Sequence, residues 1–332
     1  MTSQQAFRFS AVVEQARPQE SPSLLYVDNK LRSSTEVDRA WSRDEWIGKA
    51  RMIEDLGYTT FLVPDHVWLD VVPVPALMAV ADATSLRIGS HVFNNDFRHP
   101  VLLAREVAML DVLSGGRFEL GLGCGGIAEN YVQTGIPFDP PGVRVSRFEE
   151  ALHLIKQFFT EDEITFSGQY YHITQLKGFP KPIQKPYPPI FIGGGGKRVL
   201  SLAAREAASV GILPRGTSKG LDWASATHEA TLEKVGWIRE AAGERFDQLE
   251  IGTGIFVVIA TKEREQVAQQ MASRFGLTPE QLLSCANMLI GTVDQMVEEL
   301  LRRRELYGMS SIAVAEAGIE AFAPVVARLT GQ

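Results

Sequence analysis

Cysteine, basic charge and long apolar runs are all scarce in this chain of 332 residues. Its two cysteines, Cys124 and Cys285, exclude a disulfide framework, and we expect a reducing, cytoplasmic location. The net charge of −7 argues against a nucleic-acid partner. No apolar run reaches the roughly 18 residues of a membrane span, and the N-terminus lacks a signal-peptide core, so we expect no membrane partner. The cysteines and the six histidines show no metal-ligand spacing, so we predict no metal site.

Glycine, in contrast, is plentiful, and it gathers where a strand pattern ends. Phe118, Leu120 and Leu122 alternate with other residues in the manner of a strand. Four glycines crowd its end between residues 121 and 126. Glycines in such a place usually allow something flat or charged to touch the backbone. This pattern predicts a ligand near the end of this strand.

Strand and helix patterns alternate along almost the whole chain. Strands are predicted at 7–13, 59–65, 86–93, 117–122, 188–194, 209–214, 249–260 and 310–316. Helices are predicted at 43–56, 75–83, 99–113, 143–160, 197–208, 222–242, 263–275, 292–307 and 318–330. Apolar strands separated by amphipathic helices indicate a parallel sheet that is covered on both faces.

Eight such units favour a closed α/β barrel, the (β/α)8 or TIM barrel, over an open doubly wound sheet. We predict a single domain over residues 1–332. Two segments are long for connections, 14–40 after the first strand and 161–187 after the fourth. We treat both as candidate insertions on the substrate side.

Four consecutive glycines, Gly193, Gly194, Gly195 and Gly196, precede Lys197 at the start of a predicted helix. Their backbone N–H groups and the helix N-terminus together favour an anion. A plain tight turn and a dinucleotide-binding turn are the competing interpretations. The run has more glycines than a turn requires and lacks the spaced three-glycine fingerprint. We therefore predict a phosphate site here.

Polar side chains also stand where the second and third strands should end. Asp65 and His66 close the second strand, and Ser90, His91 and Val92 close the third. Barrel enzymes place their chemistry at this end of the strands, and histidine is suited to acid–base work. A purely structural role for either group stays open.

The loops after the third and fourth strands hold further candidates. Asn94 belongs either to a solvated turn or to a ligand contact. Cys124 and Gly125 follow the fourth strand, and the thiol is either a small packing group or a reactive one. Glu129 caps the next turn or moves a proton.

Five motifs occur in order at the predicted strand ends. They are ProAspHis at 64–66, GlySerHisVal at 89–92, ArgHisPro at 98–100, GlyLeuGly at 121–123 with GlyIleProPhe at 135–138, and ProProIlePheIle with four glycines at 188–196. Together they resemble the bacterial luciferase-like superfamily, and within it the coenzyme F420-dependent oxidoreductases. The resemblance covers residues 7 to about 328, and it implies a luciferase-like TIM barrel.

The resemblance also implies an activity, hydride transfer between the deazaflavin F420 and an organic small molecule. Two alternatives stay open: an FMN-dependent monooxygenase that uses reduced flavin and O2, and a non-catalytic flavin-binding protein. A basic patch for the polyglutamate tail would favour F420. Five residues are candidates for that patch: Lys177, Lys181, Lys185, Lys197 and Arg198. Relatives often form homodimers.

Roles for individual residues follow from the resemblance alone. It implies catalytic, proton-moving roles for His66 and Glu129, and a non-proline cis peptide between His91 and Val92. It implies cofactor contacts by Asp65, Ser90, His91, Val92, Asn94, Cys124, Gly125 and the turn from Gly193 to Lys197. The family usually has Trp at or beside the position of Cys124, so this chain departs toward a more open pocket.

Overall fold

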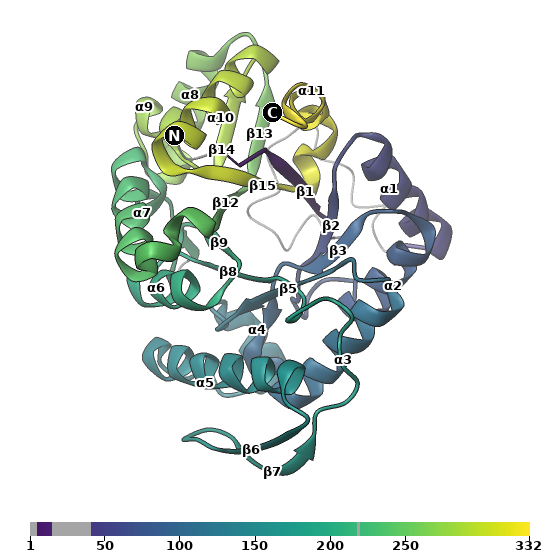
Figure 1. Cartoon of the computed structure of the whole chain (residues 1–332). Coiled ribbons are helices and arrows are strands. Elements are labelled where there is room, and N and C mark those ends of the chain that lie inside the picture. The colour runs from purple at the N-terminus through teal and green to yellow at the C-terminus, as the bar shows by residue number, and fades with distance from the viewer. Residues whose placement is uncertain (1–4, 15–40, 218–219) are drawn as a thin grey trace.

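A closed barrel of parallel strands forms the centre of the protein (Figure 1). The computed structural model describes residues 5–14, 41–217 and 220–332. The barrel strands are β1 (Arg8–Val12), β2 (Thr60–Val63), β3 (Arg87–Ser90), β5 (Phe118–Gly123), β8 (Ile190–Gly194), β9 (Ser209–Ile212), β12 (Glu250–Ile255) and β15 (Met309–Ala315). Their neighbour order is β3-β2-β1-β15-β12-β9-β8-β5, and β5 pairs back with β3. The predicted (β/α)8 barrel is confirmed.

Helices cover the outside of the barrel (Figure 1). They include α1 (Arg43–Asp55), α2 (Pro73–Ala83), α3 (Pro100–Leu113), α5 (Pro141–Thr160), α6 (Lys197–Glu206), α7 (His228–Ala242), α10 (Val293–Tyr307) and α11 (Ile319–Leu329). Local chemistry sets their ends. Helix α1 begins at a capping box in which Ser42 and Glu45 satisfy each other's backbone N–H groups. Among the described residues, no helix combines the length and apolar character that crossing a membrane requires.

The predicted strand 249–260 is in fact two strands. After β12 the chain leaves the barrel at Phe256, whose N–H bonds to the carbonyl of Asn287. Strand β13 (Val257–Ala260) then pairs with β14 (Met288–Gly291), which the sequence did not predict. Helices α8 (Arg264–Met271) and α9 (Pro279–Ser284) pack beside this pair. A continuous apolar run does not reveal where a strand changes its partner.

The segment 161–187 forms an antiparallel hairpin of β6 (Glu163–Ser167) and β7 (His172–Lys177) on the outer side of α5 (Figure 1). It begins after α5 and ends before β8, so both of its ends lie at the N-terminal ends of the barrel strands. Its turn is held by Glu150, which accepts the N–H groups of residues 169–171. At the turn of this expected substrate-side insertion, Tyr171 Oη accepts a hydrogen bond from Asn95 Nδ2. Of the other insertion, 14–40, residues 15–40 lie outside the described residues.

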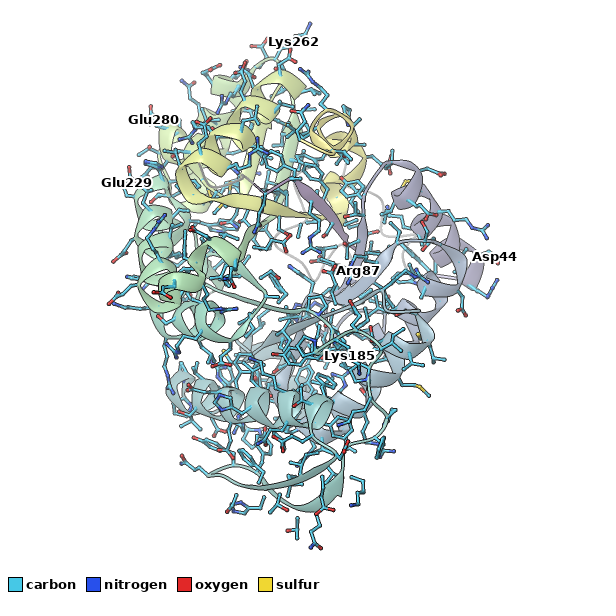
Figure 2. All side chains as sticks on the ribbon, viewed as in Figure 1. Asp44, Arg87, Lys185, Glu229, Lys262 and Glu280 are labelled. Carbon is cyan, nitrogen blue, oxygen red and sulfur yellow. The ribbon has the colours of Figure 1, made fainter. Side chains whose placement is uncertain are left out.

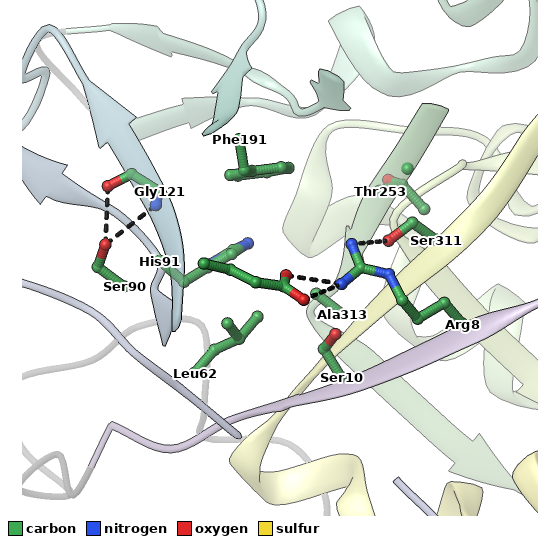
Figure 3. A pocket seen from close by; sticks show the side chains of 12 residues that line it. Arg8, Ser10, Leu62, Ser90, His91, Gly121, Phe191, Thr253, Ser311 and Ala313 are labelled. Carbon is green, nitrogen blue, oxygen red and sulfur yellow. Dashed lines mark hydrogen bonds and ion pairs between the residues drawn. The ribbon is translucent and has the colours of Figure 1, made fainter. Parts of the chain in front are cut away.

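Side chains fill the inside of the barrel, whereas charged groups such as Asp44, Glu229 and Lys262 project from the outside of the molecule (Figure 2). Toward the N-terminal ends of the strands, Arg8 Nη1 lies 2.6 Å from Glu119 Oε2. The cavity that remains measures about 30 Å³ and extends to His91 (Figure 3). That is room for a water molecule or two, whereas a cofactor needs several hundred Å³. A ligand of cofactor size therefore does not fit in this interior cavity.

Candidate active site

Two histidines meet at the mouth, because β2 and β3 are neighbours in parallel register. The ring of His66 stacks on Trp68 at 4.5 Å between centroids, and the ring of His91 stacks on Phe191 of β8 at 5.3 Å. Burial lowers the pKa of His66 to about 4, against the pull of the Asp65 carboxylate. Burial also lowers the pKa of His91 to about 4, and the proximity of His66 adds to this. Both rings are therefore uncharged at neutral pH.

Asp65 and Asn94 are occupied with the loop that follows β3. Asp65 Oδ2 lies 2.6 Å from Arg98 Nη1, and it also accepts the backbone N–H of Asn94 at 3.2 Å. Asn94 Oδ1 accepts the N–H of Asp96. Both side chains are buried. The structure thus brings the two predicted residues together and gives them contacts that position this loop.

The glycines at the end of β5 make room for the chain itself. A Cβ atom on Gly121 would lie 1.9 Å from the carbonyl oxygen of Ser90, and one on Gly123 would lie 2.7 Å from Val92 Cγ2. Ser90 Oγ also donates to the carbonyl of Gly121 at 2.8 Å. The peptide bond between His91 and Val92 is cis. The resemblance to the family implied a cis bond at this position. At Gly121 and Gly123 the backbone is therefore touched by residues 90–92, and this corrects the expectation of a ligand contact drawn from the pattern.

Cys124 and Gly125 continue this close packing. Burial raises the pKa of the Cys124 thiol, so the group is protonated at neutral pH and is a poor nucleophile. Gly125 has a φ of +69°, and a Cβ atom there would lie 1.8 Å from Tyr131 Oη. Only glycine fits this conformation and this approach.

Glu129 lies in the first turn of α4 (Ala128–Thr134), a helix that the sequence did not predict. Its side chain is exposed and accepts a hydrogen bond from Gln133 at 2.8 Å. The next residue, Asn130, instead reaches His66: its Nδ2 lies 3.1 Å from His66 Nδ1. In the described structure it is Asn130, rather than Glu129, that contacts this histidine.

A pair of carboxyl groups at the mouth was missed from the sequence. Strands β1 and β15 pair in register through Val12 and Ala315, which brings Glu14 beside Glu316. The backbone N–H of Glu14 donates to Glu316 Oε2 at 3.0 Å. Burial, together with the charge of Glu316, raises the pKa of Glu14 to about 7. The sequence did contain a signal for this pair. Closure of a barrel places the first and last strands side by side, so residues that follow these two strands are expected to be neighbours.

The glycine run after β8 serves packing at some positions and is open at one. A Cβ atom on Gly194 would lie 2.8 Å from Val199, and one on Gly195 would lie 2.6 Å from the backbone of Arg215. Gly196 is the N-cap of α6, and a Cβ atom there would meet nothing within 4 Å. Packing therefore explains Gly194 and Gly195, and it leaves Gly196 facing open space.

The basic residues do not form one patch. Lys197 is exposed and lies 3.5 Å from Glu240. Lys177, Lys181 and Lys185 precede β8, whereas Lys197 follows it, so they stand at opposite ends of that strand. Lys177 is paired with Glu163. The five candidates for a basic patch therefore do not converge on one place.

Arg144, on α5, is a buried cation without a counterion in the part of the chain that the structure describes. Its side chain is 5% exposed, and Nε and Nη1 have no hydrogen-bond partner. The guanidinium lies 4.2 Å from the ring centroid of Phe138, and its charge acts on the Cys124 thiol. Arg198 joins the start of α6 to this helix by donating to the carbonyl of Gly142 at 2.9 Å. An unpaired buried cation is costly, and an anion at this place would offset that cost.

Known proteins resemble this chain in sequence. A family model described as luciferase-like monooxygenase matches residues 30–312. An F420-dependent glucose-6-phosphate dehydrogenase of Kineococcus radiotolerans is 33% identical over 148 residues, which are 44% of this chain and 42% of that protein. An FMNH(2)-dependent dimethylsulfone monooxygenase of Pseudomonas putida is 28% identical over 169 residues, which are 50% and 43%. The chain thus spans about two fifths of the length of these curated relatives.

Solved structures share the fold. The coenzyme F420 dependent tetrahydromethanopterin reductase of Methanopyrus kandleri superposes with a TM-score of 0.73 at 17% identity, covering 98% of this chain and 100% of that one. At this sequence identity, the superposition shows only that the two proteins share a fold. The family match covers most of the chain, and the barrel that it implies is the barrel observed. The chain therefore belongs to the luciferase-like monooxygenase family.

Proposed function

We propose that this protein is an oxidoreductase that transfers a hydride between coenzyme F420 and an organic small molecule. The observation that carries the proposal is the pair of uncharged histidines, His66 and His91, at the mouth of a barrel that is otherwise filled. A bound deazaflavin would supply the hydride chemistry, and the protein would supply binding, orientation and protons. The F420-dependent dehydrogenase among the relatives supports this assignment.

Two features near the start of α6 fit the phosphate of such a cofactor. Gly196 is open to solvent at the N-terminus of α6, where backbone N–H groups lack acceptors within the helix. Arg144 offers buried N–H groups that have no partner among the described residues. Arg198 ties the two helices together, so one anion could use both features. We assign the phosphate to this place.

Proton transfer in the proposed reaction is assigned to the groups at the mouth. Glu14, with a pKa of about 7, can both donate and accept a proton at neutral pH. His66 is proposed to contact the reacting atoms, and Glu129 stays a weaker candidate because its side chain is exposed. A protein that only binds flavin has no need of such groups, which argues against the non-catalytic alternative.

An FMN-dependent monooxygenase is the second candidate. The lysines and arginine do not converge, so the argument from a polyglutamate tail is lost, and a monooxygenase stands among the relatives.

We keep a cytoplasmic location and a homodimer as proposals. Exposed Leu102, Met109 and Leu113 on α3 would suit self-association, and a monomeric mass in solution would rule it out.

Titration with F420 and with FMN tests the cofactor assignment. We expect the purified protein to bind F420 at least about tenfold more tightly than FMN, a difference of about 1.4 kcal/mol. Quenching of cofactor fluorescence measures both affinities under identical conditions. Preference for FMN would overturn the F420 assignment in favour of the monooxygenase, and absence of binding to both would overturn the oxidoreductase proposal.

Substitution of Gly196 tests the phosphate position. Gly196→Asp would place a carboxylate beside the phosphate, and we expect a loss of cofactor affinity of about tenfold. Gly196→Ala is the matched control, because a Cβ atom there meets no neighbour within 4 Å. Gly195 is unsuitable for this test, since its Cβ atom would strike the backbone of Arg215. Equal affinities of the two variants would move the phosphate elsewhere.

A further inference from the structure

Asn130 makes two side-chain contacts at once, one on each side of its amide. Its Oδ1 accepts the backbone N–H of Val67 at 3.1 Å. Its Nδ2 lies 3.1 Å from Nδ1 of the His66 ring. The residue is 3% exposed and lies in α4, so its amide is held away from solvent.

These contacts determine which ring nitrogen of His66 carries the proton. A backbone N–H can only donate, so the oxygen of the Asn130 amide has to face Val67. The NH2 group then faces His66, and it too can only donate. Nδ1 of His66 must therefore accept, which requires a lone pair on that atom. A neutral imidazole has a single N–H proton, so the proton resides on Nε2.

We infer that Asn130 is a positioning residue that holds His66 in the neutral tautomer with its proton on Nε2. Under the proposed function, on which this consequence rests, His66 presents an N–H donor to the ligand instead of a lone pair. Such a group stabilises negative charge on an acceptor atom, such as a carbonyl oxygen, and it does not abstract a proton. The acid–base role expected for His66 is thereby narrowed to hydrogen-bond donation.

The surroundings of His66 agree with this tautomer. A proton on Nδ1 would point at the NH2 group of Asn130, so the charged imidazolium is opposed there. Burial also opposes it, and the Asp65 carboxylate, which favours the charge, is itself paired with Arg98. Trp68 is stacked against the ring and holds its plane.

The substitution Asn130→Asp reverses the polarity of the contact at nearly constant shape. One carboxylate oxygen can still accept from Val67, and the other now requires a proton on His66 Nδ1. We expect the proton of the neutral ring to move to Nδ1, and the pKa of His66 to rise by about 2. Gln133→Glu is the matched control, since it makes the same charge change on the same helix and, within the described part of the chain, its amide bonds to exposed Glu129 and not to His66.

The readout is the ¹⁵N NMR spectrum of the histidine side chains, in which protonated and unprotonated ring nitrogens are well separated. The chain has six histidines, and the His66 signals are those that disappear in His66→Gln. The unsubstituted protein at pH 7 tests the inference without any change at Asn130. A protonated Nε2 and a bare Nδ1 would support it, and a protonated Nδ1 would overturn it. If the tautomer of His66 is unchanged in Asn130→Asp, the inference that Asn130 sets this tautomer is overturned. No cofactor is present, so failure of the proposed function leaves this result unaffected.

Discussion

Gly121→Ala is expected to lower the free energy of unfolding by about 3 kcal/mol or more. Its Cβ atom would lie 1.9 Å from the carbonyl oxygen of Ser90 and 3.1 Å from Val92 Cγ1. The Ser90 carbonyl cannot move freely, because Ser90 Oγ donates to the Gly121 carbonyl and accepts the Gly121 N–H. The new methyl group would therefore separate β3 from β5 at the mouth of the barrel.

Gly126→Ala is the matched control for this prediction. It lies in the same glycine run, and a Cβ atom there would have no neighbour within 4 Å. Its stability should stay within about 0.5 kcal/mol of the parent. Urea denaturation of both variants gives the comparison. Equal stability of Gly121→Ala and Gly126→Ala would mean that the run of glycines is not required by the packing of residues 90–92.

The fold was predictable because the periodicity of the chain matches its elements. A strand was predicted at the place of every barrel strand, and Ser42 with Glu45 marked the start of α1. The error at 249–260 has a physical origin. Strands β12 and β13 are both buried and apolar, and the change of partner at Phe256 depends on a hydrogen bond to distant Asn287. Nothing within the local run signals that bond.

The site was predictable where it depends on strand ends and hidden where it depends on helix packing. His66 and His91 follow β2 and β3, so barrel geometry brought them to one mouth. Asn130 and Arg144 are different, because their partners are set by how α4 and α5 rest on the barrel. In the sequence, Arg144 looks like any arginine of an amphipathic helix. Its burial and the lack of partners for its Nε and Nη1 among the described residues are what support the proposed role in binding.

Arg144→Met is expected to move stability and cofactor affinity in opposite directions. Methionine keeps an apolar stem against Phe138 and removes a buried charge that has no counterion among the described residues. The free energy of unfolding of the cofactor-free protein should therefore rise by about 1 kcal/mol. Loss of the charge-assisted hydrogen bonds to phosphate should weaken cofactor binding by about 10- to 100-fold. The rise in stability and the loss of affinity have one cause in this proposal: Arg144 is a cation that binds a ligand and does not stabilise the fold.

The two measurements are urea denaturation without cofactor and fluorescence titration with paired ligands. FMN is compared with riboflavin, and F420 with the same deazaflavin lacking its phosphate. Only the phosphorylated member of each pair should bind less tightly to Arg144→Met. Arg147→Met is the control one turn along α5, where the guanidinium is paired with Asp96 at 2.9 Å and Asp139 at 2.7 Å. It should lose stability, since the buried Asp96 carboxylate would be left without its positively charged partner. If Arg144→Met instead loses stability and keeps its preference for the phosphorylated ligands, Arg144 serves the fold, and the phosphate lies elsewhere.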